Sequence, residues 1–278
     1  MKRILRLTVL FIVATLACAA LISCNKSQNE EITPACIDIL KIGKADCIII
    51  NTGSNVIMID TGEEENLPKI NSFMQQKGYD KIDTLILTHY DKDHIGGAAS
   101  IIADYKVETV IESKFTNGSE YYSAYHNAIN DQGTSLIKLS ENYTLVSDSC
   151  ELEIDIPKKN KYEEKQSNNL SLIISLKCAD TRFLFCGDAM ELRLAEFIDY
   201  NQYKYDFVKL PYHGRYIENF EAFLASAGPS YGAITCSNKN PPAEETLVSL
   251  ADYGVSVYET RNGDVEVKTD GKQITVKQ

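Results

Sequence analysis

The segment THYDKDHIGG, residues 88–97, places two histidines and two aspartates within six positions at the end of an apolar run. The chain has four histidines, so half of them lie in this segment. A buried, ionised carboxylate is costly unless another group compensates its charge. The segment therefore indicates a metal ion held where a buried strand ends, and the alternative is a charged turn on the surface.

Hydrophobic patterning around this segment predicts strands that alternate with helices. Apolar runs bounded by turn residues predict strands over 36–43, 46–53, 55–62, 82–90, 107–113, 150–157, 170–178, 181–188, 205–214, 231–236, 255–260, 264–269 and 273–277. Helical spacing predicts helices over 65–79, 96–105, 121–131, 189–201, 217–228 and 243–254. Residues 158–169 are polar and unpatterned, which predicts an exposed loop. With no linker to divide it, the body is expected to form one α/β domain of layered sheets covered by helices.

The first 23 residues are predicted to be a lipoprotein signal peptide. A basic start, MKRILR, precedes a 16-residue apolar run, which is shorter than the roughly 20 residues of a membrane span. The run ends in LISC, which resembles the bacterial lipobox, so Cys24 is predicted to carry lipid as the first residue of the mature chain. An ordinary signal peptide, in which Cys24 is incidental, is the alternative. Residues 24–35 are expected to form a solvated tether, and the protein to be an extracytoplasmic, membrane-anchored bacterial lipoprotein.

Charge argues against an extended nucleic-acid partner. The full chain has a formal charge of −11, and removing residues 1–23 leaves 25 basic against 39 acidic residues, or −14. No block of lysine or arginine forms the basic stripe that nucleic-acid binding uses. The partners that remain are a small substrate and, through the lipid anchor, a membrane.

Six cysteines follow Cys24, and none of them form a C-x-x-C pair, which argues against a zinc ribbon. They are Cys36, Cys47, Cys150, Cys178, Cys186 and Cys236. An extracytoplasmic location permits disulfides. Several of these cysteines lie in apolar, strand-like runs that are typical of buried free thiols, so both states stay open.

The spacing within HYDKDH separates the four ligand candidates into two pairs. In extended backbone, residues i and i+2 point to the same side, so His89 and Asp91 are placed to hold one metal ion together. Asp93 and His94 follow where the chain turns into a helix, and they are expected to face a neighbouring position. The paired glycines after them permit a tight turn and a close approach of the backbone.

Two later stretches repeat the pattern of a buried strand followed by a polar residue. FLFCGDA supplies Asp188, and FVKLPYHG supplies His213. Each stretch alone is also typical of an ordinary strand-end turn. Together with the first four candidates they provide six oxygen or imidazole ligands, which suffice for two adjacent cations.

The order IDTG, THYDKDHIGG, FLFCGDA and KLPYHG resembles the metallo-β-lactamase superfamily, and within it the ComEC-like branch, named for the hydrolase domain of competence proteins. The entry into strand 170–178 and the closing segment also resemble that branch, so the resemblance covers roughly residues 36–275. It implies an αββα sandwich over residues 36–278, with a metal site at one edge between the two sheets.

The resemblance also implies the role of each ligand. His89 and Asp91 would bind a first metal ion, and Asp188 would bridge it to a second. The second ion would be bound by Asp93, His94 and His213. Asp93 and Asp188 would act catalytically, and Asp93 would also orient the water.

The chain departs from the family pattern at three places. Asp91 stands where the wider superfamily has histidine, and Tyr212 replaces the first histidine of the branch's HHG. The superfamily's third histidine is missing, and Asn168 or Asn169 lies near its place. We expect these asparagines, Tyr212 and Arg215 to contact substrate, since an arginine fork suits a phosphate or carboxylate; for Arg215 the alternative is a surface residue beside aromatic rings.

The leading functional hypothesis is a metal-dependent hydrolase with one or two divalent ions, zinc or manganese. The carboxylate-rich first site favours a hard ion such as Mn²⁺, and the metal would lower the pKa of a bound water. The expected substrate is a small phosphodiester or related ester, because polynucleotide affinity requires many basic contacts and only Lys92, Lys209 and Arg215 flank the ligands. The alternatives are an extracytoplasmic nuclease and a non-catalytic binding lipoprotein on the same fold.

Replacing Cys24 by alanine tests the lipid anchor. Cys24→Ala should move the protein from the membrane fraction to the soluble fraction or block its processing, because two or more acyl chains are needed for stable anchoring. Fractionation of cells followed by immunoblotting measures this. Unchanged membrane association would indicate an uncleaved signal anchor instead.

Overall fold

A computed structural model describes residues 35–163 and 166–278 of the chain. The predicted signal peptide, Cys24 and all but the last residue of the tether lie outside these ranges, so their assignment stays a prediction. In the described ranges, no helix is long and apolar enough to cross a membrane.

The first sheet has eight strands, antiparallel on one side and parallel on the other. In spatial order they are β15 (Ile274–Lys277), β14 (Val265–Thr269), β1 (Ala35–Ile39), β2 (Ile48–Asn51), β3 (Val56–Ile59), β4 (Lys81–Ile86), β5 (Lys106–Ser113) and β6 (Ser135–Leu139). Strands β15 to β3 pair antiparallel, and β3 to β6 pair parallel.

The second sheet has seven strands and the same division. In spatial order they are β13 (Ser256–Glu259), β12 (Tyr231–Ile234), β11 (Phe207–Lys209), β10 (Thr181–Phe185), β9 (Ile173–Cys178), β8 (Cys150–Asp155) and β7 (Tyr143–Ser147). Strands β10 to β13 pair parallel, whereas β7 to β10 pair antiparallel.

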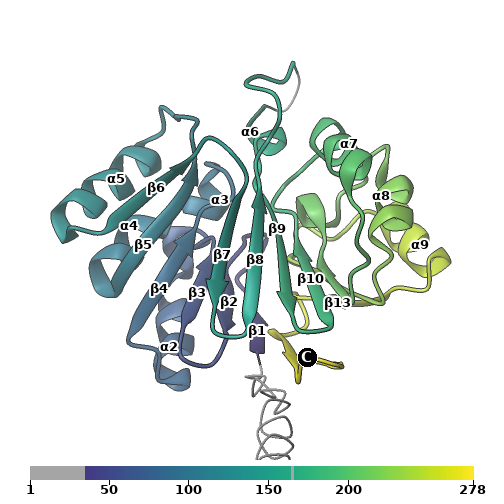
Figure 1. Cartoon of the computed structure of the whole chain (residues 1–278), viewed down its shortest axis with the longest axis horizontal. Coiled ribbons are helices and arrows are strands. Elements are labelled where there is room, and N and C mark those ends of the chain that lie inside the picture. The colour runs from purple at the N-terminus through teal and green to yellow at the C-terminus, as the bar shows by residue number, and fades with distance from the viewer. Residues whose placement is uncertain (1–34, 164–165) are drawn as a thin grey trace, which may run out of the picture. The chain divides into compact units, whose positions relative to one another are not determined.

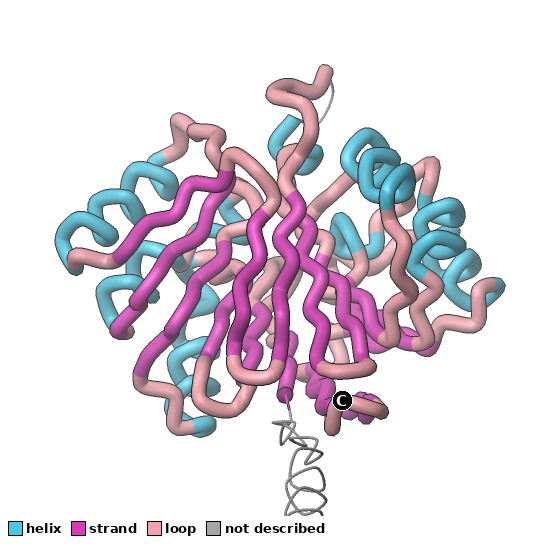
Figure 2. Tube along the Cα trace, in the orientation of Figure 1, coloured by secondary structure: helices cyan, strands magenta, loops and turns pink. Residues whose placement is uncertain are grey.

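Helices cover the outer faces of both sheets, because parallel neighbours need crossover connections. The first sheet carries α2 (Leu67–Lys77), α4 (Ala98–Asp104) and α5 (Glu120–Gln132), and the second carries α7 (Glu191–Tyr200), α8 (Phe220–Ala227) and α9 (Glu244–Asp252). Short turns of helix are η1 (Glu64–Asn66), α3 (Lys92–Ile95), α6 (Gln166–Asn169) and η2 (Pro211–Gly214). Figures 1 and 2 show the helices on the two flanks and the strands between them. The predicted αββα sandwich is confirmed.

Three apolar clusters hold these layers together. Between the sheets, inward residues such as Ile50, Leu152 and Phe183 are fully buried. The other two clusters lie between each sheet and its own helices. Burying one such side chain contributes roughly 1.5–3 kcal/mol, so the packing on both faces of each sheet holds the layers together.

Two details differ from the sequence-based expectation. Strands β6 and β7 had no predicted counterpart, because each is the edge strand of its sheet and has few fully buried side chains. The segment 158–169, expected to be an exposed loop, instead buries Tyr162 and Asn169 and ends in α6. The hydroxyl of Tyr162 donates to Glu196 of α7 over 2.8 Å, which ties this segment to the second sheet's helices.

One pair of cysteines forms a disulfide. Cys150 and Cys178 lie directly opposite each other on β8 and β9 and are bonded. In the described residues, Cys36, Cys47, Cys186 and Cys236 are free. Of the two states left open by the sequence, Cys150 and Cys178 adopt the disulfide, and the other four described cysteines are thiols.

Replacing Cys150 and Cys178 together by alanine should lower the free energy of unfolding by about 3 kcal/mol, because the bridge closes a loop of 28 residues. Denaturant unfolding before and after reduction measures the effect. The double variant should be insensitive to reductant, and the control Cys186→Ala should keep wild-type sensitivity. Equal stability of oxidised and fully reduced wild-type protein would contradict the bridge.

Candidate metal centre

The carboxyl ends of parallel strands from both sheets meet at one edge, where α/β proteins bind ligands. A polar residue follows each of these strands. Asp60 follows β3, His89 and its neighbours follow β4, Asp188 follows β10, His213 follows β11 and Thr235 follows β12. Both sheets therefore contribute side chains to one site.

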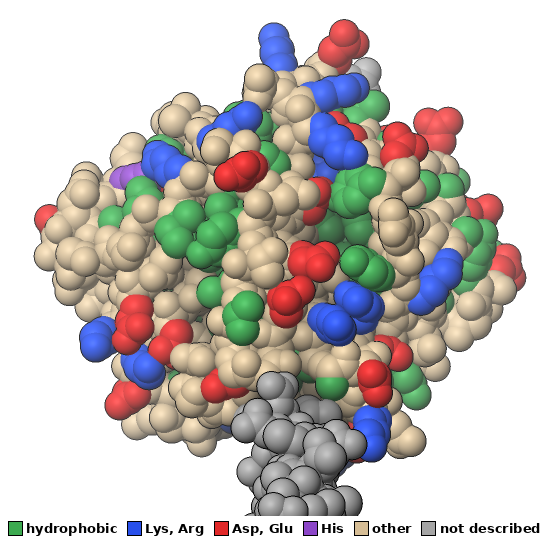
Figure 3. Space-filling model, viewed as in Figure 1, with side chains coloured by type: hydrophobic (Ala, Val, Ile, Leu, Met, Phe, Trp, Pro, Cys, Tyr) green, Lys and Arg blue, Asp and Glu red, His purple; other side chains and the backbone are tan. Residues whose placement is uncertain are grey.

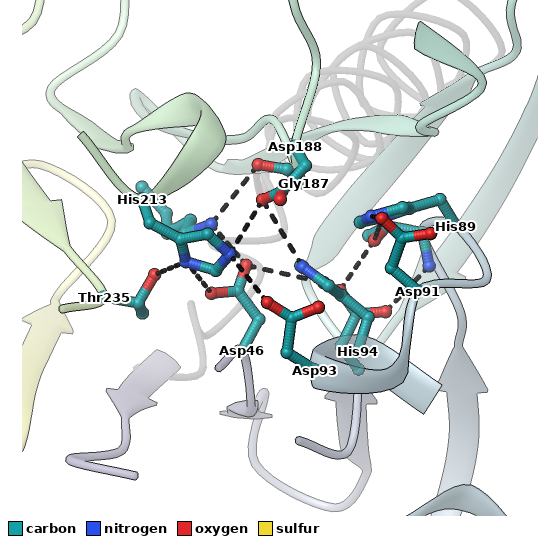
Figure 4. A network of polar contacts seen from close by, with 12 residues as sticks. Asp46, His89, Asp91, Asp93, His94, Gly187, Asp188, His213 and Thr235 are labelled. Carbon is teal, nitrogen blue, oxygen red and sulfur yellow. Dashed lines mark hydrogen bonds and ion pairs between the residues drawn. The ribbon is translucent and has the colours of Figure 1, made fainter. Parts of the chain in front are cut away.

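Four of the predicted ligands form a tight, buried cluster. Asp188 Oδ1 lies 3.1 Å from His213 Nε2 and 3.4 Å from His94 Nε2, and Asp93 Oδ2 lies 3.5 Å from His213 Nε2. One ligand atom from each residue lies within 4.8 Å of all the others. Figure 4 shows Asp188 between the two histidines, with Asp93 facing them. This is the group assigned to the second metal ion.

His89 and Asp91 form the neighbouring pair, as their i, i+2 spacing predicts. His89 Nε2 lies 3.7 Å from Asp91 Oδ2, and the His89 and His94 ring centroids are 4.0 Å apart. The His89 side chain is buried, whereas that of Asp91 is 38% exposed. The first position is therefore more open to solvent than the cluster of four.

The buried atoms without hydrogen-bond partners fit a metal ion. Within the described residues, they include Nε2 of His89, His94 and His213 and Oδ1 of Asp188. Leaving such a group unsatisfied costs about 1–3 kcal/mol each. All four are lone-pair donors of the kind that a divalent cation takes as ligands, and Asp188 Oδ1 lies within 3.4 Å of Nε2 of both His94 and His213.

Asp60 holds the ring of His94 from behind. His94 Nδ1 lies 2.7 Å from Asp60 Oδ2, and the other carboxylate oxygen accepts the backbone N–H of Thr88 at 2.8 Å. Asp60 itself has a φ of +58°, a strained value for a residue other than glycine. The Nδ1 contact leaves Nε2 free to bind metal. Asp60 lies in the IDTG motif, but sequence reasoning gave it no role.

A buried ion pair supports His213, and sequence reasoning missed it. Asp46 and Lys209 are both buried and in direct contact, and Asp46 Oδ1 lies 3.6 Å from His213 Nδ1. The Lys209 ammonium also donates to the carbonyl oxygen of Gly187 at 3.3 Å, next to Asp188. His213 Nδ1 lies 2.9 Å from Thr235 Oγ1. The Asp46–Lys209 pair thus holds His213 directly and holds the backbone beside Asp188.

The acids of the cluster stay ionised in spite of burial. Burial opposes ionisation of Asp188, yet the adjacent His213 and His94 hold its pKa well below the usual range. His213 and His94 likewise lower the pKa of Asp93 against the effect of its burial. Burial would lower the pKa of both histidines, and the Asp188 carboxylate raises it. The carboxylates therefore remain available as ligands at neutral pH.

The short helix α6 lies where the superfamily's third histidine was expected. Ser167 Oγ donates a hydrogen bond to Asp91, and Asn168 Nδ2 donates to Asp188 Oδ2 at 3.3 Å. Asn169 is buried, and its side-chain oxygen accepts a backbone N–H in the first turn of α7 at 3.0 Å. Of the two predicted asparagines, Asn168 contacts the ligand cluster and Asn169 contacts α7.

The rim of the site carries Tyr212, Arg215 and Lys44. Tyr212 and His213 have φ values of 48° and 53°, so the backbone is strained where it presents the ligand. Arg215 is exposed, with its guanidinium 5.6 Å from the Tyr212 ring centroid. Lys44, which sequence reasoning did not consider, forms an ion pair of 2.7 Å with Asp93.

The sequence model of the Metallo-beta-lactamase superfamily matches residues 41–236. The chain belongs to this superfamily. It is therefore a metallo-β-lactamase-fold hydrolase, and the fold binds divalent metal ions, in agreement with the donor cluster described above.

Curated relatives confirm the ComEC-like resemblance. The hydrolase is 22% identical over 268 residues to ComE operon protein 3 of Bacillus subtilis, covering 88% of this chain and 34% of that protein. It is 24% identical over 258 residues to Recombination protein 2 of Haemophilus influenzae, covering 87% and 30%. The chain thus spans about a third of the length of these relatives.

Solved structures show the same fold at low identity. The Bacillus subtilis metallo-beta-lactamase fold protein YhfI matches with a TM-score of 0.55 and 12% identity over 84% of this chain and 99% of that one. CmlA, a diiron beta-hydroxylase from Streptomyces venezuelae, matches with 0.53 and 13% over 81% and 52%. A diphosphatase from the PhnP family matches with 0.50 and 11% over 81% and 94%.

Substitution of Asp188 should have the largest effect on metal binding. Asp188→Ala should abolish hydrolysis and reduce bound metal, because Asp188 lies beside both His94 and His213. His89→Ala should retain part of the metal and still damage turnover. Metal per chain, measured by inductively coupled plasma mass spectrometry, tests both.

His126 provides the matched control, since it lies on α5 beside Glu112, 3.1 Å away, and outside the cluster. His126→Ala should keep the wild-type metal content. Full metal content and full rate in both ligand variants would show that the assigned residues are not the ligands.

Proposed function

We propose that the protein hydrolyses a small phosphodiester or related ester, with one or two zinc or manganese ions held by the six predicted ligands. The observation that carries this proposal is the buried cluster in which Asp188 Oδ1 lies 3.1 Å from His213 Nε2 and 3.4 Å from His94 Nε2, while none of these three atoms has a hydrogen-bond partner outside the cluster among the described residues. The chain belongs to the metallo-β-lactamase superfamily. The cluster contains no cysteine that could serve as a nucleophile.

Bound metal would supply Lewis acidity and lower the pKa of a coordinated water to about 7. The chain's own residues hold the geometry for that chemistry. His94 and His213 present Nε2 because their Nδ1 atoms are held by Asp60 and Thr235. Imidazole and carboxylate donors suit zinc, and the pair of His89 with Asp91 is more favourable to a hard ion such as Mn²⁺ than two imidazoles are.

The charges around the site favour a substrate with one anionic group. Each nearby lysine is already paired with an acid: Lys44 with Asp93, Lys92 with Glu63 and Lys209 with Asp46. Arg215 is exposed and makes no ion pair with the residues that the structure describes. A guanidinium fork can bind two oxygens of one phosphate. Successive phosphates of a strand would require further free cations.

The names of similar proteins support different substrates. One fold neighbour is a diphosphatase, which supports phosphoryl chemistry, whereas ComE operon protein 3 is the kind of relative that motivates the nuclease alternative. The formal charge of −14 that we expect for the mature chain argues for the small substrate. We place this activity outside the cytoplasm, on a protein anchored through Cys24.

Comparison of two substrates tests the proposal. The metal-loaded protein should hydrolyse bis(p-nitrophenyl) phosphate and leave single-stranded DNA largely intact at moderate salt. Arg215→Ala should raise KM for the diester about tenfold, because a charge-assisted contact is lost, and Arg215→Lys should recover part of that loss. Efficient, processive degradation of DNA would overturn the small-substrate proposal in favour of a nuclease.

A further inference from the structure

A hollow lies on the outer face of the second sheet, and none of the proposed metal ligands lines it. It has a volume of about 370 Å³ and lies between strands β7 to β10, the end of α7 and residues 201–205. Figure 3 views this face and shows a recess of hydrophobic side chains beside acidic ones. The volume is within the range of small-molecule sites.

The floor of the hollow is a row of neighbours across four strands. Thr144 pairs with Glu153, Glu153 with Ser175, and Ser175 with Leu184. Directly opposite residues project from the same face of a sheet. The alternate residues on these strands point inward to the core between the sheets. The row therefore presents one carboxylate and one buried hydroxyl to the hollow.

Aromatic rings form the wall. Phe197, Tyr200, Tyr203 and Tyr205 line the hollow, and the Phe197 ring centroid lies 6.0 Å from Tyr200 and 6.3 Å from Tyr205. An aromatic face attracts a cation placed over it, so rings that line a hollow favour a positively charged ligand.

Two of these rings already contact cations of the chain. Lys158 Nζ lies 3.9 Å from the Tyr200 ring centroid, and the Arg182 guanidinium carbon lies 3.9 Å from that of Tyr203. Each of these two rings therefore already has a cation of the chain over it, and the rings of Phe197 and Tyr205 complete the wall.

The polar groups of the hollow are acidic or neutral. Its lining residues include Glu153 and Asp155 but no lysine, arginine or histidine. Asp155 is paired with Arg193, whereas Glu153 makes no ion pair within the described part of the chain. Ser175 is 8% exposed, and its hydroxyl interacts with the Tyr205 side chain. The Glu153 carboxylate is thus the charged group of the lining that remains for a ligand.

We propose that this hollow binds a small organic cation with an ammonium head group, held by the Glu153 carboxylate and the surrounding aromatic rings. The unpaired acid disfavours an anion, because the two basic residues at the wall, Lys158 and Arg182, lie against the Tyr200 and Tyr203 rings and do not line the hollow. An uncharged polyol would use the rings and the Ser175 hydroxyl but not the charge of Glu153. Binding that depends on the charge of Glu153 therefore distinguishes an ammonium ligand from an uncharged polyol.

Choline and its uncharged isostere 3,3-dimethylbutan-1-ol are suitable probes. Each is titrated into the ¹⁵N-labelled full chain at low salt, and amide shifts are followed by NMR. Choline should shift the signals of Ser175, Tyr200 and Tyr203, and the alcohol should shift them at least fivefold less at equal concentration. Glu153→Gln should weaken choline binding about fivefold.

Glu151→Gln is the matched control, since Glu151 lies on the same face of β8, is also half-buried and does not line the hollow. It should leave choline binding unchanged. Equal shifts from the alcohol, stronger shifts from glucose, or equal losses in the two glutamate variants would overturn the proposal. So would the absence of shifts up to about 50 mM choline, well above the roughly millimolar dissociation constant expected of so small a ligand.

Discussion

The site depends on carboxylates that are buried where the strands end. Asp46, Asp60 and Asp188 are at most 2% exposed. Each is costly to bury without a compensating charge or hydrogen bond. Lys209 compensates Asp46 from the second sheet, while His94 bonds to Asp60 and contacts Asp188 across the sheets. Because the Asp46–Lys209 and His94–Asp188 pairs each join one sheet to the other, the charge balance of the site also helps to fix the edge at which the two sheets meet.

The part of the site that sequence predicts is the part whose signal is local. His89, Asp91, Asp93 and His94 lie within six positions at the end of a continuous apolar strand, so spacing alone separates them into two groups. Asp188 and His213 follow the same pattern singly, and only their combination with the first four, and the family resemblance, marked them as ligands. The same apolar runs predicted the αββα layers, because buried strands leave a strong hydrophobic pattern.

The features that could not be predicted from the sequence involve residues that are distant along the chain or strands that lie at a sheet edge. Asp46 and Lys209 are 163 residues apart, and they touch only because the start of β2 lies beside the end of β11. The disulfide likewise requires the register that sets Cys150 opposite Cys178. Strands β6 and β7 escaped because edge strands bury less and keep polar residues. Each of these features is determined by how the strands are arranged in the folded protein, which local sequence patterns do not encode.

Anomalous diffraction at the zinc or manganese absorption edge tests the central claim most directly, because it locates the metal itself. We expect a strong peak about 2.0–2.2 Å from Nε2 of His94 and His213 and from the Asp188 carboxylate, with a second peak beside His89 if both positions fill. Metal-loaded crystals that showed no peak between these side chains, or showed it elsewhere on the molecule, would contradict the account.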